Sequence, residues 1–600
     1  MALLHPIFRA CVLLAGTVAA AAHAFPLQVR SEDGKPLPLV MVTRAPQPRP
    51  AADTSDNGYA PSGKPQQGAW ETTRFSDAQG RVEMPDAAGA FTLRLRRPGF
   101  RDLVLASKDL AGKDTVTLVA ETSVRALAEQ RPSNAWTATL STAMPDPALR
   151  KEFMLQCGFC HQQGSAFLRR ERGAAEWDGT IRRMVGYGSR LSSEARKSLP
   201  AVLEAHWKEI SAHPERVPAG TPWGEYLPRA QVDELPLGDR FSQMHDLLAH
   251  SNGMVYVGDN LQDRLYEVDP ATGAYTVHRL PHAPDDVPGG LVAGRLRDFP
   301  KHEAYQGLHS LAESRKDGHI FLTPSSQRRL LEFDPKTKRF TSHAMPGGFY
   351  PHTVRVDAKD RVWFTLALSN QVAMFDRTTA SFRLYDLPFR SWMEKLTTRL
   401  TPFFFKLIGW GIPIANWVKV DHASTGVPLP YGIDITPDGK VWFARLHTDE
   451  IGRIDPDSGA VTMVATPLRA PRRLRSDRDG NLWISMFSES AVLRYEPATG
   501  RFTTFEMPVA PKGSDTPYAL NVDRQRHQVW VTGTNSDSAQ RLDIATGRWQ
   551  FYPLPRKATF TRDVEFGPRG EVFLSSASFP SWHIEDAQPT LIRLVPAAAP

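Results

Sequence analysis

Cysteine is scarce in this chain, with three residues in 600, and this scarcity excludes a fold held together by disulfides. Cys11 lies in a short apolar N-terminal stretch, which leaves only the close pair Cys157 and Cys160. Apolar runs long enough to cross a bilayer are also lacking, so we expect no membrane-spanning helix. The net charge of +7 is spread along the chain without a basic tail or a nucleic-acid-binding motif, and we expect no nucleic-acid partner.

The N-terminus is typical of an export signal. Arg9 precedes a small, apolar stretch at residues 12–22, and Ala22-His23-Ala24 has the small-x-small form of a cleavage site. A membrane anchor is the alternative, but the stretch is too short to span hydrocarbon. We therefore predict that residues 1–24 are a signal peptide cleaved near Ala24 and that the mature protein is periplasmic. The remaining chain is long enough for several domains.

The cysteine pair belongs to a motif with a specific chemistry, Cys157-Gly158-Phe159-Cys160-His161. Two thiols three residues apart can add to the two vinyl groups of a haem, and the adjacent imidazole reaches the iron from the same side. A zinc site would need a second ligand pair nearby, and a thioredoxin-like pair would need a βαβ context. We therefore predict one covalent haem c, attached at Cys157 and Cys160, with His161 as the first axial ligand.

Residues 135–215 predict a small helical domain around this motif. An amphipathic pattern at 177–184 ends in Met184, and Ser192-Ser193-Glu194 opens a helix that runs to about Trp207. The layout resembles class I cytochrome c domains, in which a tryptophan and an Arg-Met step precede a final helix. The resemblance implies Met184 as the second axial ligand, and core packing is the alternative role for this side chain. Methionine ligation would raise the reduction potential, which suits passing electrons to a periplasmic electron-transfer partner.

Residues 25–121 predict a small β-sandwich ahead of the haem domain. Alternating stretches at 91–95 and 115–119 are separated by turns rich in glycine, aspartate and proline. The turns at 34–37, 77–81 and 97–100 are similar to those of carboxypeptidase regulatory-like domains. That resemblance implies an accessory role rather than a catalytic one.

Seven repeats fill residues 232–597. Each has a short strand, an Asp-Gly-like turn, an aromatic strand, and two further strands joined by an Asp-Pro-x-x-Gly-like turn. The predicted first strands begin at Met244, Leu308, Pro351, Pro430, Pro471, Pro517 and Thr561. One four-stranded unit cannot bury both of its faces, so neighbouring units are expected to stack into a ring. The predicted fold is mainly β: a seven-bladed β-propeller, a small α-helical cytochrome c domain and an N-terminal β-sandwich.

The repeat from Pro430 to Phe443, continued by Ile451-Gly452-Arg453-Ile454-Asp455-Pro456, resembles the streptogramin B lyase (virginiamycin B lyase) family of propellers. The resemblance covers roughly residues 235–595 and concerns the scaffold. Because one fold serves many functions, the function has to be argued from the site.

One position of the repeat is expected to face the central axis in every blade. Around the ring it is occupied by His245, His309, His352, Tyr431, Arg472, Tyr518 and Arg562. A plug would be apolar or small, whereas these are three consecutive imidazoles and two guanidiniums. We predict that the histidines are catalytic and hold a second metal, copper, iron or another divalent ion, and that the arginines grip a small anionic or oxygenated substrate. The haem would then act as electron acceptor in a dehydrogenase-type oxidoreductase.

Two other functions remain open. The related lyases use a histidine base, a second histidine and a divalent cation, and His309 and His352 match that spacing. The lyases place a metal-binding glutamate after the aromatic strand, but Leu366 and Arg445 stand there, which removes a ligand that Mg²⁺ prefers. The third class is a non-catalytic electron carrier whose propeller is a docking platform.

Two insertions interrupt the repeats, at about 281–306 and 387–429, and both are expected to enter from the histidine-bearing face. The second is aromatic and broken by Pro402 and Pro413. A helical lid is one expectation for it, and shallow membrane contact through residues 390–418 is another.

Overall fold

The computed structural model describes residues 24–48, 60–85, 89–296, 299, 302–417 and 426–597. The predicted signal peptide, residues 1–24, lies outside this part of the chain except for Ala24. Among the described residues, no helix is long and apolar enough to cross a membrane.

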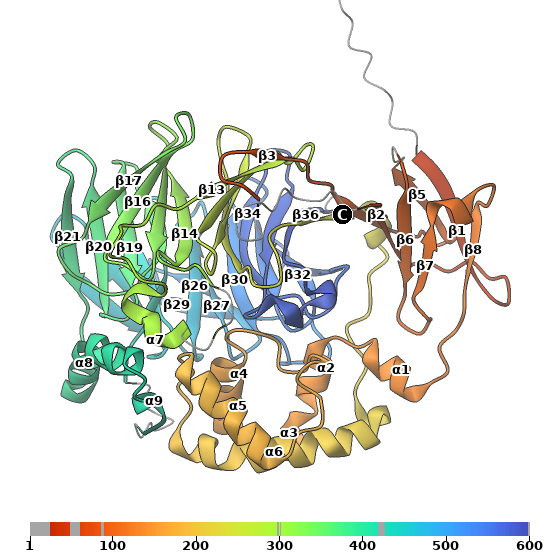
Figure 1. The fold of residues 1–600 in the computed structure, drawn as a ribbon, viewed down its shortest axis with the longest axis horizontal. Coiled ribbons are helices and arrows are strands. Elements are labelled where there is room, and N and C mark those ends of the chain that lie inside the picture. Colours follow the sequence, from red (N-terminus) through yellow and green to blue (C-terminus); the bar gives the residue numbers. More distant parts are fainter. Residues whose placement is uncertain are drawn as a thin grey trace, which may run out of the picture.

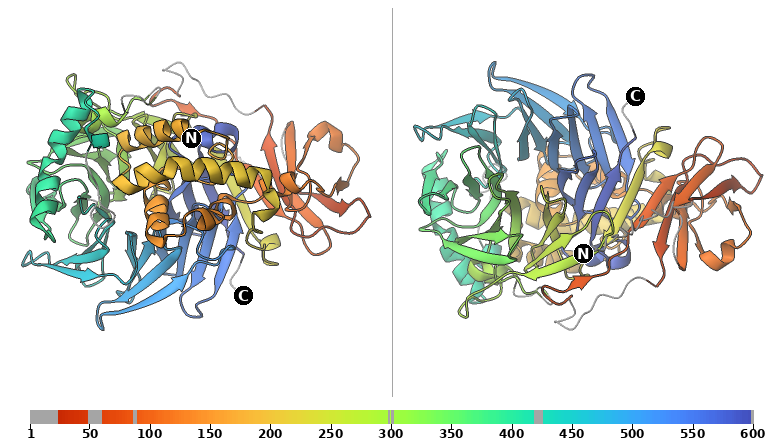
Figure 2. Two further views of the ribbon diagram at one scale, coloured as in Figure 1. Left: turned by 90° about the horizontal axis from the view of Figure 1, so that it is seen from below. Right: turned by 90° about the horizontal axis from the view of Figure 1, so that it is seen from above.

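Seven antiparallel sheets form a closed ring, as Figures 1 and 2 show. The first three are β10 (Met244–Ala249), β11 (Val255–Asp259), β12 (Arg264–Val268) and β13 (Tyr275–Arg279); β14 (Leu308–Glu313), β15 (Ile320–Pro324), β16 (Arg329–Asp334) and β17 (Arg339–Ala344); and β18 (Pro351–Val356), β19 (Arg361–Leu366), β20 (Gln371–Asp376) and β21 (Ser381–Asp386). The next three are β22 (Pro430–Ile435), β23 (Val441–Arg445), β24 (Glu450–Ile454) and β25 (Val461–Ala465); β26 (Pro471–Ser476), β27 (Leu482–Met486), β28 (Ala491–Glu496) and β29 (Arg501–Glu506); and β30 (Pro517–Asp523), β31 (Gln528–Gly533), β32 (Ser538–Asp543) and β33 (Trp549–Pro553).

The seventh sheet closes the ring with strands from both ends of the repeat region. It contains β34 (Thr561–Phe566), β35 (Val572–Ser576), β36 (Thr590–Val595) and β9 (Gln231–Pro236), and β36 pairs with β9. The first strands touch in the order β10, β14, β18, β22, β26, β30, β34 and again β10. Each of them begins at the residue predicted from the sequence. The chain is therefore mainly β, with a propeller ring.

The repeated sequence pattern forms the same kind of contact in different blades. The indole nitrogen of Trp363 donates to Asp357 at 2.9 Å, and that of Trp483 donates to Asp477 at 3.0 Å. In each pair the aspartate begins the turn before the aromatic strand, so the turn and the strand are tied together. Apolar side chains from neighbouring sheets meet between them, and the core is accordingly divided among the gaps around the ring.

The N-terminal segment extends this ring. Beyond β9, the seventh sheet continues with β4 (Glu71–Phe75), β2 (Met41–Pro46), β6 (Phe91–Arg96) and β7 (Leu103–Ala106), giving eight strands. A separate three-stranded sheet of β1 (Ala24–Ser31), β5 (Arg81–Pro85) and β8 (Thr115–Leu118) packs with it around an apolar core, and β3 (Pro65–Gln66) pairs with β13. The described strands thus form eight sheets, because β1, β5 and β8 make a sheet of their own, while other N-terminal strands lengthen two of the seven blades.

Helices cover one face of the ring (lower side in Figure 1). They are α1 (Val124–Glu129), α2 (Ser133–Ala138), α3 (Leu140–Ala143), α4 (Pro147–Cys157), α5 (Ala174–Gly186) and α6 (Ser193–Ala212), here called the helical layer. Their shared core includes Trp136, Trp177 and Trp207. The helices predicted around 177–184 and from Ser193 are therefore present. Short 3-10 turns occur at η1 (Ser107–Leu110), η2 (Pro214–Arg216), η3 (Leu227–Arg229), η5 (Ser581–His583) and η6 (Glu585–Ala587).

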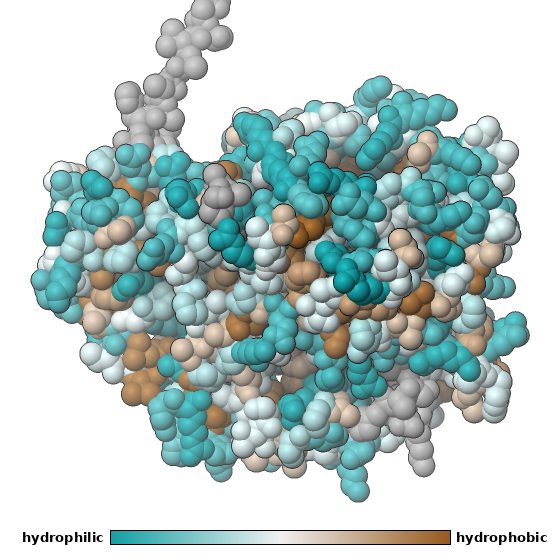
Figure 3. Space-filling model, turned by 180° about the vertical axis from the view of Figure 1, so that it is seen from behind, coloured by the Kyte–Doolittle hydropathy of each residue, from teal (hydrophilic) through white to brown (hydrophobic). Residues whose placement is uncertain are grey.

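Both insertions lie on this same face, as the view from below in Figure 2 also shows. The first contains η4 (Gly290–Val292) and α7 (Ala293–Leu296), and the second contains α8 (Trp392–Gly409) and α9 (Ile414–Trp417). Helix α7 packs on α8, and α9 touches α5. Figure 3, which views the molecule from behind relative to Figure 1, shows a mostly hydrophilic surface with apolar residues scattered over it.

Candidate functional site

A β-bulge places the same residue of each first strand at the ring axis. In all seven blades the pairing between the first and second strands is interrupted after the first residue and resumes three residues later. The side chain that follows the first residue is thereby turned out of the ladder. Three of the bulges follow a non-glycine residue in the left-handed region, Tyr350, Leu429 and Ala470, with φ of 65°, 58° and 59°. The predicted inward positions are thus built by a repeated backbone device.

The three predicted histidines form a tight stack at this level. The ring centroids of His245 and His309 are 3.8 Å apart, and those of His309 and His352 are 3.6 Å apart. All three are buried, and burial lowers the pKa of His245 to about 4 and the pKa values of the other two well below the ordinary range. They are therefore neutral imidazoles, the form that binds metals or accepts protons.

An aspartate missed by the sequence analysis orients the first histidine. Asp246 lies 2.9 Å from Nδ1 of His245 and is held on both oxygens by Arg473, at 3.0 and 2.5 Å. Because a carboxylate only accepts, His245 carries its proton on Nδ1 and presents Nε2 to the axis. The only hint in the sequence was that Asp246 directly follows His245.

These groups partly satisfy the needs of a metal site. Ligand atoms of His245, Asp246 and His309 lie within 4.8 Å of one another. Nδ1 of His309 is buried without a hydrogen-bond partner among the described residues. Asp246, however, is already engaged by Arg473, so the imidazoles are the donors that remain for copper, iron or another divalent ion.

Two tyrosines and two arginines complete the ring. Tyr518 places its hydroxyl 3.2 Å from Nε2 of His245 and 3.0 Å from the hydroxyl of Tyr431. Arg472 donates to Tyr431 at 2.6 Å, and Arg562 donates to Tyr518 at 3.0 Å. Burial alone would raise the pKa of the Tyr518 phenol, but the guanidiniums of Arg472 and Arg562 outweigh it and lower that pKa. Tyr518, His245 and Asp246 therefore form a hydrogen-bonded chain suited to moving a proton.

The two arginines differ in how their charge is used. Arg562 donates its hydrogen bonds to protein groups. Its Nε donates to the carbonyl of Ala577 at 2.8 Å, and its Nη2 donates to the carbonyl of Cys160 at 3.3 Å. Arg472 is fully buried, and in the described part of the chain its Nε and Nη1 have no hydrogen-bond partner. Four aromatic rings surround its guanidinium at 3.5–4.5 Å, those of Phe159, Tyr431, Phe487 and Tyr518. Arg472 is thus the better placed of the two to meet an anion.

The Cys-x-x-Cys-His loop sits directly on this ring. Phe159 packs edge-on against Tyr431 at 6.2 Å and faces Arg472, while the carbonyl of Cys160 accepts from Arg562. Gln162 anchors the loop by donating to the carbonyls of Thr534 and Thr559, both at 2.6 Å. Leu155 of α4 joins Phe159 in the apolar cluster at the mouth. The loop and the axial residues therefore form one continuous site.

The residues of this loop fit a c-type haem. Cys157 and Cys160 are both free thiols, and burial raises the pKa of each. His161 is buried, its pKa is lowered to about 4 mainly by burial, and its Nδ1 contacts Nε2 of Gln163 at 3.2 Å, which leaves Nε2 available to a ligand or metal. Cys160 borders an apolar cluster of Leu261, Leu296, Phe299, Ala304 and Phe579. Apolar walls beside two thiols and a neutral imidazole are what such a haem requires.

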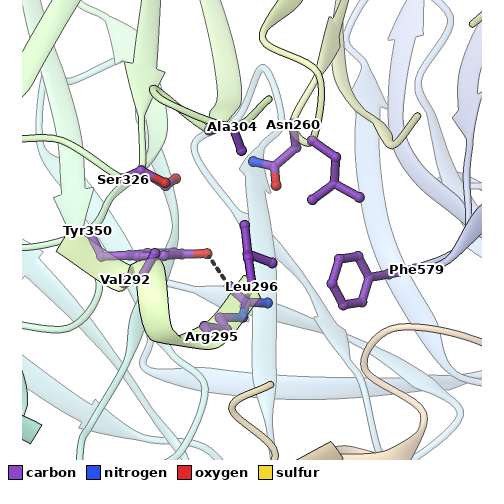
Figure 4. Close-up of a pocket in the computed structure, with 11 residues that line it drawn as sticks. Asn260, Val292, Arg295, Leu296, Ala304, Ser326, Tyr350 and Phe579 are labelled. Carbon is purple, nitrogen blue, oxygen red and sulfur yellow. Dashed lines mark hydrogen bonds between the residues drawn. The ribbon is translucent and has the colours of Figure 1, made fainter. Parts of the chain in front are cut away.

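A small cavity opens beside Cys160, and Figure 4 shows its lining. Arg295 of α7 donates to the hydroxyl of Tyr350 at 3.0 Å on one side, and Phe579 closes the other. Arg295 also donates to the carbonyl of Tyr187, just after α5, at 2.6 Å. The first insertion thus joins the helical layer to the ring next to the attachment loop.

Two residues are candidates for a second ligand to a haem held at this loop. Met184 lies half-buried on α5, outside the shared core of the helical layer. His583 was not identified from the sequence; its ring centroid lies 4.6 Å from that of His161, and its Nδ1 is buried without a partner in the described chain. The backbone N–H of Phe579 donates to Cys160 at 3.0 Å and fixes this segment against the loop. Nothing in the spacing of the repeats marks His583, because it lies outside the strands.

Comparison with known proteins agrees with the fold. Residues 417–578, which hold the fourth to sixth blades and the start of the seventh, match the sequence profile of the Virginiamycin B lyase family. This propeller is virginiamycin B lyase-like. No curated protein matches the chain.

Solved structures resemble it only remotely. Virginiamycin B lyase from Staphylococcus aureus aligns at 17% identity and a TM-score of 0.45, over 61% of this chain and 99% of the other. A streptogramin B lyase aligns at 17% identity and a TM-score of 0.45, over 61% of this chain and 98% of the other. Kuenenia stuttgartiensis hydrazine synthase aligns at 11% identity and a TM-score of 0.41, over 58% of this chain and 95% of the other. Likenesses of this size carry no argument about activity.

Proposed function

We propose that this protein is a periplasmic c-type haem oxidoreductase of the dehydrogenase type, whose propeller mouth binds and oxidises a small anionic or oxygenated substrate. One observation carries the proposal. The haem-attachment loop forms part of the wall of the axial site, because Phe159 faces Arg472 and Cys160 accepts from Arg562 at 3.3 Å. Any molecule bound at the axis therefore lies beside the loop that would hold the haem.

The chain's own residues have distinct roles in this proposal. Cys157 and Cys160 would form the two thioethers, and His161 and Met184 would ligate the iron. The haem, when bound, supplies a one-electron acceptor that is re-oxidised by a periplasmic electron-transfer partner.

The axial side chains handle the substrate and its proton. Arg472 has two buried guanidinium nitrogens without a partner in the described chain, and these suit a carboxylate or another oxyanion. Tyr518 lies 3.2 Å from Nε2 of His245, whose Nδ1–H is held by Asp246, so it can pass its hydroxyl proton to that imidazole and take the substrate proton in its place. His309 and His352 complete the neutral imidazole stack, which would hold copper, iron or another divalent ion if a second metal takes part.

A lyase using a histidine base and a divalent cation is the second candidate, favoured by the grouping of His245, Asp246 and His309. The two positions at which the lyases carry glutamate remain unsuited to a hard cation. Leu366 is fully buried, and Arg445 is paired with Glu450 at 2.5 Å. A non-catalytic electron carrier is the third candidate, and the unpaired buried charge of Arg472 argues against a merely structural axis.

The test uses full-length protein made in a host that attaches c-type haem. We expect one covalent haem per chain and measure iron and copper by elemental analysis. Copper, or a second iron, would support a metal at the three histidines; one iron alone would remove the metal-centred version. Small carboxylates and oxygenated compounds are then screened for reduction of the ferric haem. Absence of covalent haem would overturn the proposal.

Two variants test the axial site by itself. His309→Ala and Arg472→Gln should lower substrate-driven haem reduction by at least about 100-fold while the haem spectrum and chemical reduction by dithionite stay unchanged. Arg453→Gln, on the outer part of the fourth blade, is the control for losing a guanidinium. Full activity in both axial variants would exclude the axis as the site, and turnover with magnesium but no haem reduction would favour the lyase.

A further inference from the structure

Helix α8 turns its polar side toward the protein. Its three buried residues are Glu394, Thr398 and Thr401. Glu394 accepts from Arg390 at 3.1 Å and lies 3.9 Å from Arg445 of the fourth blade. A surface helix of a globular protein ordinarily buries its apolar stripe, so the first half of α8 is inverted, whereas in its second half Phe405 packs against Phe349.

The apolar side of α8 faces outward. One stripe consists of four residues spaced four, four and three apart. Their exposed fractions are 71% for Trp392, 44% for Leu396, 38% for Leu400 and 52% for Phe403. Met393 lies beside them at 50%. Such a continuous exposed stripe costs free energy in water unless something covers it.

Two further exposed tryptophans follow the stripe. Trp410 at the end of α8 is 69% exposed, and Trp417 at the end of α9 is 67% exposed. Indole rings concentrate where one side is apolar and the other is polar and hydrated, as at the surface of a bilayer.

The charges next to the stripe are all positive. Lys395, Arg399 and Lys406 are exposed on α8 and, at helical spacing, lie together along one edge of the apolar stripe. The single acidic residue of α8, Glu394, is buried on the opposite side, and α9 has none. This pattern is complementary to anionic headgroups, whose surface attracts basic residues flanking an apolar face.

We propose that α8 and α9 bind the surface of an anionic lipid bilayer, with the apolar stripe inserted at the level of the headgroups. The helices are firmly mounted for this role: α7 packs on α8, and Arg196 of α6 donates to the carbonyl of Asn416 at 3.0 Å. Binding in this way holds the helical layer, which lies on the same face of the ring, next to the membrane (Figure 1). The inference does not depend on the reaction at the ring axis.

Flotation with vesicles tests the proposal on the full-length protein. We expect binding to phosphatidylcholine vesicles that contain phosphatidylglycerol, weaker binding without it, and loss of binding as salt is raised. Trp392→Ser combined with Trp410→Ser should lower the partition coefficient by more than about tenfold. Lys395→Gln, Arg399→Gln and Lys406→Gln should each lower it about fivefold on anionic vesicles only.

Val104→Ser is the matched control, because Val104 is 62% exposed on β7 of the N-terminal segment, and we expect it to bind like the unchanged protein. Thermal melting verifies that each variant folds. No binding to anionic vesicles, or binding that the tryptophan variants leave intact, would overturn the proposal. Light scattering tests whether a second copy of the chain covers the stripe instead. If the protein forms a dimer that dissociates in the Trp392→Ser, Trp410→Ser variant and does not bind vesicles, the proposal is also overturned.

Discussion

The buried guanidinium of Arg472 sets the chemistry of the axis at the scale of single residues. It has no carboxylate partner in the described chain, and a buried, unpaired charge ordinarily costs several kcal/mol. The faces of Phe159, Tyr431, Phe487 and Tyr518 offset part of that cost through cation–π contacts. An anion at this position would complete the pairing, so the proposed substrate site would favour negative or strongly polar ligands.

The second axial ligand gives a prediction at the same scale. We expect Met184→Ala to abolish the methionine–iron charge-transfer band in the near infrared and to lower the reduction potential, because thioether ligation favours ferrous iron. His583→Ala is the comparison, since its ring lies 4.6 Å from that of His161, and it should keep the band. Absorption and electron paramagnetic resonance spectra check both variants. A spectrum that changes in His583→Ala but not in Met184→Ala would identify His583, instead of Met184, as the second ligand.

At the scale of elements, the N-terminal strands and the ring share one sheet. Pairing of β4 with β9 runs from Glu71 opposite Glu234 to Arg74 opposite Gln231. The two glutamates are buried and meet Arg556, which follows β33, at 2.7 Å each. Burial raises the pKa of Glu234, so this carboxylate depends on its guanidinium partner to stay ionised.

Arg556→Met should therefore destabilise the junction strongly. Removing the guanidinium leaves two buried carboxylates side by side, and we expect a loss of roughly 3–5 kcal/mol in the free energy of unfolding. Arg569→Met removes an exposed guanidinium, 80% accessible, from its 2.7 Å pair with Glu571 and should cost under about 1 kcal/mol. Urea denaturation measures both variants. Equal stability of the two would show that the buried triad contributes little.

At the scale of the whole molecule, the helical layer is docked on the ring through buried polar contacts. Asn134 of α2 donates to Ser514 at 2.9 Å, and Gln162 donates to the carbonyl of Thr534 in the sixth blade and to that of Thr559, just before β34. His447, after β23, completes the interface: its Nδ1 lies 3.2 Å from the carbonyl of Val427, and its Nε2 lies 3.5 Å from Gln156 of α4.

Acid should loosen this interface. Burial, reinforced by Arg190 and Arg472, lowers the pKa of His447 from 6.5 to about 3. A histidine with a lowered folded-state pKa contributes its full stability above its unfolded pKa and loses it as pH falls toward the folded value. We expect the melting temperature to fall between about pH 7 and pH 4, and His447→Gln to flatten that dependence. His213→Gln, at an exposed position, is the control, and an unchanged slope in His447→Gln would contradict this assignment.

Much of the architecture could be predicted from local sequence. The starts of all seven first strands, and the seven residues that face the axis, follow from the repeat, because each blade buries the same pattern of side chains. The Cys-x-x-Cys-His motif can also be recognised from neighbouring residues alone, since both thiols and the imidazole lie within one turn. These features depend on residues close together in the chain, and the sequence by itself therefore determined the ring and the Cys-x-x-Cys-His motif.

Only the tertiary structure decided how the parts meet. Phe159 and Arg472, Cys160 and Arg562, and Asp246 and Arg473 are pairs separated by more than 200 residues, and no periodicity relates their members. The pairing of β4 with β9 and the exposure of the apolar side of α8 likewise depend on which surfaces dock together. Packing between remote segments is selected by the burial and charge pairing of the whole fold. That selection joined the predicted attachment loop to the predicted axial ring in a single site.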